Sequence, residues 1–233
     1  MSFTPNSRSR VTLLLVASVL CGAAWFGLAR GPDIEFELGY AYETGNFHGW
    51  TPGFTQDYRS AARWLQRAAD ADLPRAQYRL GILHAHGWGV ARDDKRAIDW
   101  FTRSARNDYA PACFHLGWMY YKGDGVSQDH ARAIALLEHA ADQGLAAAHL
   151  ALGKLHQRGA GMPADAVQAL KWHTLAVHFA QSRPEVFDNA AFATRALDAR
   201  NALTAQMPPA KIEQSRALAR EWLAKQQYQT HRS

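Results

Sequence analysis

The sequence predicts an all-α fold, an α/α solenoid of about four helix-pair repeats. Two observations predict it: the chain repeats itself at a fixed interval, and each copy carries apolar residues at helical spacing. Leu-Gly pairs begin at Leu80, Leu116 and Leu152, 36 residues apart. Such a period is typical of stacked helical units, each of which buries its apolar face on its neighbours. One N-terminal transmembrane helix and a C-terminal helical cap complete the predicted architecture.

A glycine-rich loop is expected between the two helices of each repeat. Three copies read GWGVARD, KGDGVSQD and GAGMPAD, again 36 residues apart. Glycine at a helix C-terminus adopts the left-handed backbone, and the Asp that ends each copy can cap the next helix. A calcium loop is the alternative, but Asp124 is not repeated and too few oxygen ligands are in view. We therefore interpret these loops as structural and expect no metal site.

The repeats are predicted to cover residues 35–181. The first Leu-Gly pair, at Leu38, lies 42 residues before the next, so this copy carries six extra residues between Gly45 and Gly53. After Ser182 the pattern lapses, and Pro184 opens the first of two further helices. The expected ranges are 35–74, 75–110, 111–146 and 147–181 for the repeats, 182–228 for the capping helices and 229–233 for a frayed tail.

Two long stretches resemble a Sel1-like repeat, an α/α relative of the tetratricopeptide repeat. They read LGWMYYKGDGVSQDHARAIALLEHAADQGLAAAHLALG and RLGILHAHGWGVARDDKRAIDWFTRSA. The glycine pair and the longer period separate them from the tetratricopeptide repeat, which recurs at about 34 residues. The resemblance implies a right-handed α-solenoid that acts as an adaptor or scaffold, often in bacterial envelopes or in signalling. It does not identify the partner.

The N-terminus predicts a membrane anchor. Residues 1–10 are a basic segment, 11–29 are an uncharged apolar run, and 30–34 are a linker. Nineteen helical residues span roughly 28 Å, close to a bilayer core of about 30 Å. The basic residues before this run predict a cytoplasmic N-terminus and a periplasmic repeat domain on a bacterial inner membrane. A cleaved signal peptide, which would leave a secreted periplasmic protein, is the alternative.

The charge and the cysteine content argue against a nucleic-acid partner and against a disulfide in the repeat domain. The formal net charge is +5, but residues 1–30 hold three arginines and no acid, which leaves +2 for the remainder. Interspersed charges of both signs do not resemble a nucleic-acid footprint, so no nucleic-acid partner is expected. Cys113 is the only cysteine beyond the apolar run, so we expect no disulfide in the repeat domain and a buried thiol.

Catalytic and cofactor motifs are not found. The sequence has no G-x-S-x-G, H-E-x-x-H or P-loop pattern, and its histidines show no zinc-type grouping. His84 and His156 share a repeat position with Tyr42 and Tyr120, which favours a partly buried aromatic role. We therefore expect an adaptor that binds a protein or peptide without catalysis and without a cofactor. The alternatives are a hydrolase or binding protein for cell-wall fragments or β-lactams, suggested by cysteine-rich relatives, and a periplasmic regulator that restrains a sensor kinase.

Aromatic residues mark the candidate partner-binding surface. Trp118 and Tyr121 lie three apart on the first helix of the third repeat, so they share a face. Tyr40 takes the position of Trp118 in the first repeat. We expect Tyr121 to be exposed, because its equivalents are not core types, whereas for Trp118 exposure and packing between repeats remain equal alternatives. Phe47 and Trp50, in the insertion of the first repeat, are either held out for a partner or folded back as a plug.

Overall fold

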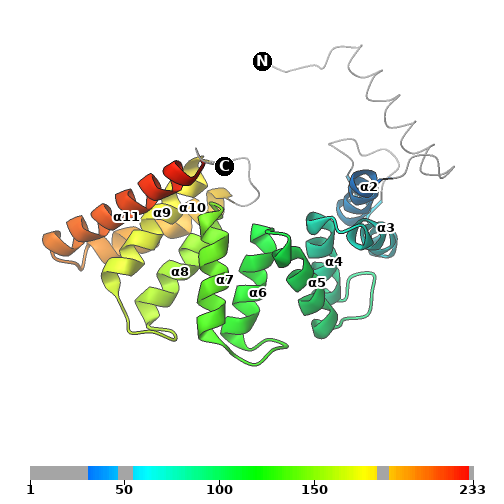
Figure 1. Ribbon diagram of the computed structural model, residues 1–233, viewed down its shortest axis with the longest axis horizontal. Helices are drawn as coiled ribbons and strands as arrows, with labels where there is room; N and C mark the ends of the chain where they lie inside the picture. The colour runs from blue at the N-terminus through cyan, green and yellow to red at the C-terminus, as the bar shows by residue number, and fades with distance from the viewer. Residues whose placement is uncertain (1–30, 47–54, 183–188, 231–233) are drawn as a thin grey trace, which may run out of the picture. The chain divides into compact units, whose positions relative to one another are not determined.

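The computed structural model describes residues 31–46, 55–182 and 189–230 (Figure 1). These residues form ten α-helices and no strand. The chain divides into two compact units, one up to Trp100 and one from Phe101 onward. The helices are α2 (Pro32–Thr44), α3 (Tyr58–Asp70), α4 (Pro74–His86), α5 (Asp94–Arg106), α6 (Ala110–Lys122), α7 (His130–Asp142), α8 (Ala146–Arg158), α9 (Ala166–Ser182), α10 (Asn189–Thr204) and α11 (Pro209–Thr230). The all-α prediction is confirmed.

In the first unit, α3 packs between α2 and α4. Small alanines allow the helix backbones to approach, and leucines fill the space between them. Gly39 on α2 is one such point of approach, because a Cβ built there would lie 2.7 Å from Leu65 Cγ on α3. The buried core of this unit consists of Phe36, Ala62, Leu65, Ala68, Ala69, Ala76, Leu80 and Leu83.

In the second unit, each of the helices α6 to α9 packs against the next along the chain. The two C-terminal helices pack against α9, and α11 runs alongside it (Figure 1). The N-terminal half of α11 places Ile212 near Leu170 of α9, and its C-terminal half places Trp222 on the core of the third and fourth repeats. Gln226 near its end donates a hydrogen bond to Asp142 of α7 at 3.0 Å.

The glycine loops have the predicted structural role. Gly123 ends α6 with φ 78°, and its N–H donates to Met119 O. Gly125, two residues later, has φ 73°. Asp129 then caps α7, because its side chain accepts the Arg132 N–H at 2.9 Å. Asp124 is exposed and lies 4.0 Å from Lys122 Nζ.

The second glycine of a loop also contacts the preceding repeat. Gly161 has φ 74°, and a Cβ built on it would lie 2.4 Å from His130 Cβ at the start of α7. Gly89 has the same relationship to Tyr58 at the start of α3, with the nearest backbone atom 2.2 Å away. Each of these loops therefore needs glycine for its backbone conformation and for the contact between repeats.

Two predictions at the ends of the chain concern residues that the structure does not describe. The predicted anchor, 11–29, lies outside the described residues, and within them no helix is both long and apolar enough to cross a bilayer. Pro184, expected to open the first capping helix, also lies outside them, and α10 begins at Asn189. Cys113 is buried and free, as predicted, with 1% of its surface exposed.

Candidate partner-binding surfaces

Tyr40 is an exposed aromatic residue in the first unit. It lies on α2 with 37% of its surface accessible, and its ring stacks on Phe36 one turn earlier, with centroids 6.1 Å apart. Phe36 itself is buried in the core. The pair therefore extends the core of the first repeat to the surface.

Two arginines of α4 cover these rings. Arg79 lies over Tyr40 at 4.8 Å from the ring centroid, and Arg75 lies over Phe36 at 4.2 Å. The two arginines lie four positions apart on α4, and the two aromatic residues lie four positions apart on α2. Each arginine therefore covers one ring, one helical turn from the other such contact. The result is an aromatic and cationic surface on α2 and α4.

Glu43 fixes the arginine beside Tyr40. Arg79 Nη1 donates to Glu43 Oε1 at 3.0 Å, and the Glu43 side chain is only 7% exposed. Burial raises the pKa of the Glu43 carboxyl above its ordinary value, and the Arg79 charge opposes this shift. The second oxygen, Oε2, is buried and has no hydrogen-bond partner. Tyr40, Arg79 and Glu43 thus form one preorganised group on α2 and α4.

Trp118 and Tyr121 do share a face of α6, with ring centroids 5.2 Å apart. Both pack against the buried core, and both are half-buried. His130, at the start of α7, lies 5.4 Å from the Tyr121 ring and covers it. The expectation that Tyr121 is exposed was therefore wrong, because a residue of the following helix packs against it.

The remaining two predicted residues, Phe47 and Trp50, lie outside the described residues. Trp88, which the sequence reasoning missed, is the other exposed large hydrophobic residue among those that the structure describes, at 40%. It lies in the loop after α4 and stacks on His86 at 4.5 Å and on Tyr58 at 5.3 Å. An available signal was that tryptophan stands here at a loop position where the other copies have Asp124 and Ala160.

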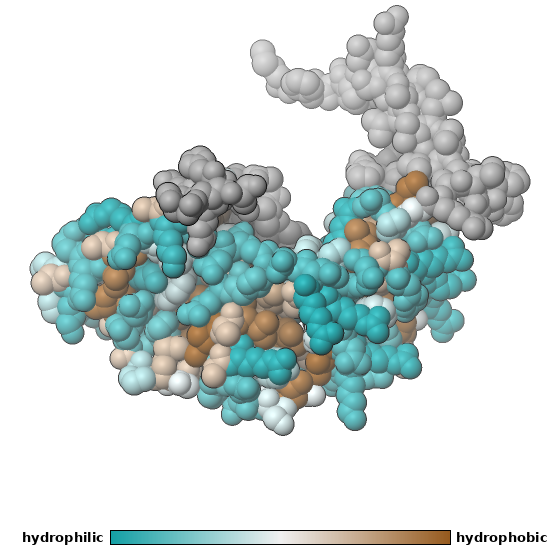
Figure 2. Space-filling view, viewed as in Figure 1, coloured by the Kyte–Doolittle hydropathy of each residue, from teal (hydrophilic) through white to brown (hydrophobic). Residues whose placement is uncertain are grey.

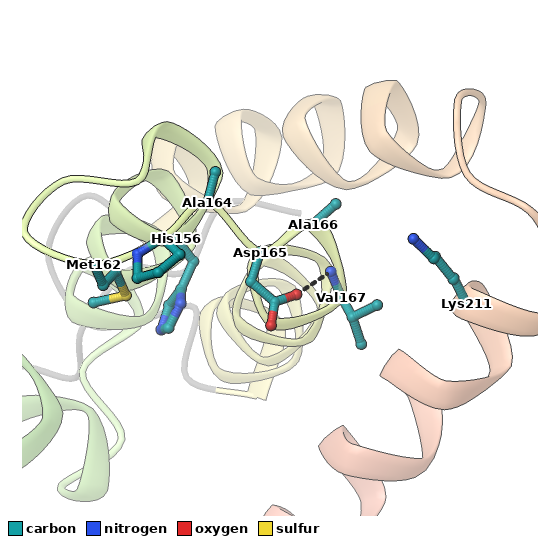
Figure 3. Close-up of a pocket in the computed structure, with 8 residues that line it drawn as sticks. His156, Met162, Ala164, Asp165, Ala166, Val167 and Lys211 are labelled. Carbon is teal, nitrogen blue, oxygen red and sulfur yellow. Dashed lines mark hydrogen bonds between the residues drawn. The ribbon is translucent and has the colours of Figure 1, made fainter.

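A pocket of about 440 Å³ lies where the loop between α8 and α9 meets the start of α11 (Figure 3). His156, Asp165 and Lys211 line it from three elements. Asp165 is committed to capping α9, because its Oδ1 accepts the Val167 and Gln168 N–H groups at 2.8 and 3.0 Å. Burial lowers the pKa of the His156 imidazole below its ordinary value, and the Asp165 charge opposes this shift.

The lining of this pocket contains no Ser, Thr or Cys side chain beside the imidazole. Within the part of the chain that the structure describes, no three His, Cys, Asp or Glu side chains gather as metal ligands. His156 is half-buried, and its repeat equivalent His84 is buried, in agreement with the packing role predicted for them.

Figure 2 shows that hydrophobic surface gathers over α6 and α7, with hydrophilic surface around it.

Comparison with known proteins gives the same fold. The chain matches the model of the Sel1 repeat four times, at residues 32–73, 74–109, 110–145 and 146–177. It resembles the crystal structure of c5321, a protective antigen of uropathogenic Escherichia coli strains that displays an SLR fold, with 26% identity and a TM-score of 0.62. That match covers 78% of this chain but only 40% of the antigen.

A second similar structure is a Sel1 repeat protein from Oxalobacter formigenes, with 22% identity and a TM-score of 0.62. This match covers 94% of the present chain and 98% of the other, and it shows the fold alone. A comparison with curated proteins finds no match for the sequence. Sel1 repeat proteins are generally scaffolds for protein interactions. Since the four matched repeats account for more than half of its residues, the chain belongs to the Sel1 repeat family.

Proposed function

We propose that this protein is a membrane-anchored adaptor of the bacterial envelope, which binds a protein or peptide partner in the periplasm and carries out no chemistry. The Sel1 repeats support the adaptor role, because such repeats generally bind proteins. The apolar run at 11–29, with arginines before it, supports the anchor and its orientation.

The observation that carries the binding role is the exposed Tyr40 ring with Arg79 held over it. Tyrosine and arginine are enriched among residues that dominate binding energy. Because Glu43 and the stacked Phe36 already hold this group in place, a partner orders little when it binds. The group therefore favours a partner segment that lays an apolar side chain on Tyr40 and offers a hydrogen-bond acceptor to Arg79.

Site-specific photo-cross-linking tests this surface. A photoreactive phenylalanine analogue at position 40 is expected to capture the partner in cells, whereas the same group at Arg63, exposed on the second helix α3, is not. Mass spectrometry then identifies the captured protein. Equal capture from both positions, or capture from position 63 alone, would place the partner elsewhere.

Affinity measurements with the identified partner test the energetics. Tyr40→Ala is expected to weaken binding by about 2 kcal/mol, roughly thirtyfold, because a truncated hot-spot residue costs that much. The melting temperature should change little, since Tyr40 lies at the surface. Arg63→Ala is the matched control and should leave both quantities unchanged. Full-strength binding by Tyr40→Ala would exclude α2 and α4 as the main contact.

Cell fractionation tests the anchor separately. The full-length chain is expected to stay with membranes through a high-salt wash, and a version that begins at Gly31 is expected to be released. A C-terminal tag should be accessible to protease from the periplasm only. Release of the full-length chain by salt alone would contradict the anchor without affecting the binding surface.

A further inference from the structure

A core position that is apolar in three repeats is a histidine in the fourth. The position lies on the second helix, and it holds Leu65, Phe101, Leu137 and His173, each 36 residues after the last. His173 has no exposed surface. Neither Nδ1 nor Nε2 of its ring has a hydrogen-bond partner. Since buried polar groups are nearly always paired, this replacement costs stability at a site where leucine fits the repeat.

The first helix of the same repeat carries a second buried histidine. His149 takes the position of Gln77 and Cys113 and is also completely buried. Its Nδ1 lies 3.0 Å from Leu145 O, an acceptor, so Nδ1 carries the proton and donates it. Nε2 is buried without a partner, as is Nε1 of the neighbouring Trp172. Each helix of the fourth repeat, α8 and α9, therefore carries a buried histidine with at least one ring nitrogen that has no partner.

His149 lies where three helices meet. Its ring centroid is 4.7 Å from that of Phe179 and 5.7 Å from that of Trp172, both on α9. Trp222 of α11 packs edge-to-face against His149 at 5.3 Å and also contacts Phe179, at 5.8 Å. A change in the charge of this imidazole therefore acts on the contact of α11 with the repeat stack.

The charged groups that act on the two rings are cationic or become so in acid. Lys171 and His178 of α9 act on His149, and Lys154 of α8 acts on His173; α11 faces His149 with the uncharged Trp222. Burial is the main cause that lowers the pKa of each histidine to about 4. Aromatic faces attract an imidazolium, but this attraction does not replace the lost solvation of a fully buried ring.

We propose that the fourth repeat is an acid-sensitive joint, in which protonation of His149 and His173 loosens α9 and the helices packed on it, α10 and α11. Both rings are neutral in the folded state, whereas an opened state binds protons at the ordinary histidine pKa of about 6.5. The packing of the repeat is therefore fully stable above that pH and weakens as pH falls toward 4. Because repeats contact mainly their neighbours, a solenoid can open at one end. This joint goes beyond partner binding and does not depend on it.

Hydrogen exchange on the full-length chain in neutral detergent tests the joint. Between pH 7 and pH 5, after correction for intrinsic exchange rates, opening of α9 to α11 should increase by about twentyfold for each histidine that is released. The helices α6 and α7 serve as the internal reference and should change much less. A uniform change along the second unit, or no change in α9 to α11, would overturn the proposal.

Repeat-matched substitutions identify the responsible rings. His173→Leu restores the residue of two other repeats, and His149→Gln restores the residue of the second repeat. Each should remove part of the acid response, and the double variant should remove most of it. His139→Gln is the control, because His139 is exposed on α7 beside Asp108. A double variant that keeps the wild-type response, or a control that loses it, would contradict the proposal.

Histidine NMR titration of the unmodified chain avoids any folding defect of the variants. The rings of His149 and His173 should stay neutral in the folded state down to about pH 5. Their NMR signals should change only together with the loosening of α11. Titration of either ring near pH 6.5 while α11 stays protected would overturn the proposal.

Discussion

Gly153 of α8 lies against the imidazole of His173 on α9, because a Cβ built on the glycine would be 2.5 Å from His173 Nδ1. The glycine is helical, so its role here is to let a side chain approach, not to supply an unusual backbone angle. Gly39 and Gly117 stand in the same relation to Leu65 and Leu137, at 2.7 and 3.1 Å from the Cγ atoms. In these three Leu-Gly pairs the glycine thus receives one side chain of the second helix.

Gly153→Ala is expected to destabilise the protein by about 1–3 kcal/mol, the usual cost of an added methyl group in a packed core. Denaturant unfolding measures it. In a double variant with His173→Ala, the smaller side chain leaves room for the new methyl group, so the combined cost should be less than the sum of the two single costs. Additive costs would show that the two residues are not in contact.

His173→Leu should stabilise the protein at pH 7 by about 1–3 kcal/mol, because it removes two buried nitrogens that have no partner. At this pH the imidazole is neutral, so the gain measures the burial of polar atoms and not of charge. Thermal unfolding at pH 7 is the measurement. An unchanged or lower melting temperature would indicate that ordered water already satisfies the ring.

Substitutions of a glycine and of an exposed aspartate in the loops should have contrasting effects on stability. Gly161→Ala should cost about 2 kcal/mol or more, because alanine disfavours φ 74° and its Cβ would collide with His130. Asp124→Ala should change stability by less than about 0.5 kcal/mol, since its side chain is exposed. Melting that depends on calcium and is abolished by Asp124→Ala would overturn the structural interpretation of the loop.

Truncation of the aromatic residues separates binding from packing. Tyr121→Ala and Trp118→Ala should each lower stability by about 2 kcal/mol, since both rings pack against the buried core. Tyr40→Ala, at an exposed site, should have a much smaller effect on the melting temperature. A Tyr121→Ala variant with the wild-type melting temperature would restore the exposed role that the sequence predicted for this residue.

Cys113 should react slowly with thiol reagents. Burial raises its pKa to about 11, and Asp108 adds to the shift, so almost no thiolate forms at pH 8. Labelling with a chromogenic disulfide should be slow in the native protein and fast in denaturant. A Cys21→Ser background leaves Cys113 as the single thiol. Rapid native labelling would mean that α6 opens readily.

The sequence by itself determined the repeated architecture. Helix pairs have local requirements: a glycine loop between the helices and an aspartate that caps the second helix. Because these features recur in several repeats, the loop at Gly123 to Asp129 was predicted correctly. Cys113 is buried, as expected of a free cysteine that acts as a small hydrophobic side chain.

Only the tertiary structure decided which side chains are covered and which are unpaired. Tyr121 is half-buried because His130 packs on it, and Tyr40 stays exposed under Arg79 of another helix. The sequence places a histidine at position 173, but the lack of a partner for its ring appears only once the surrounding helices are packed. The exposure and the hydrogen bonds of a side chain depend on residues of neighbouring helices. The repeat period reflects only the residues that are required within each helix pair.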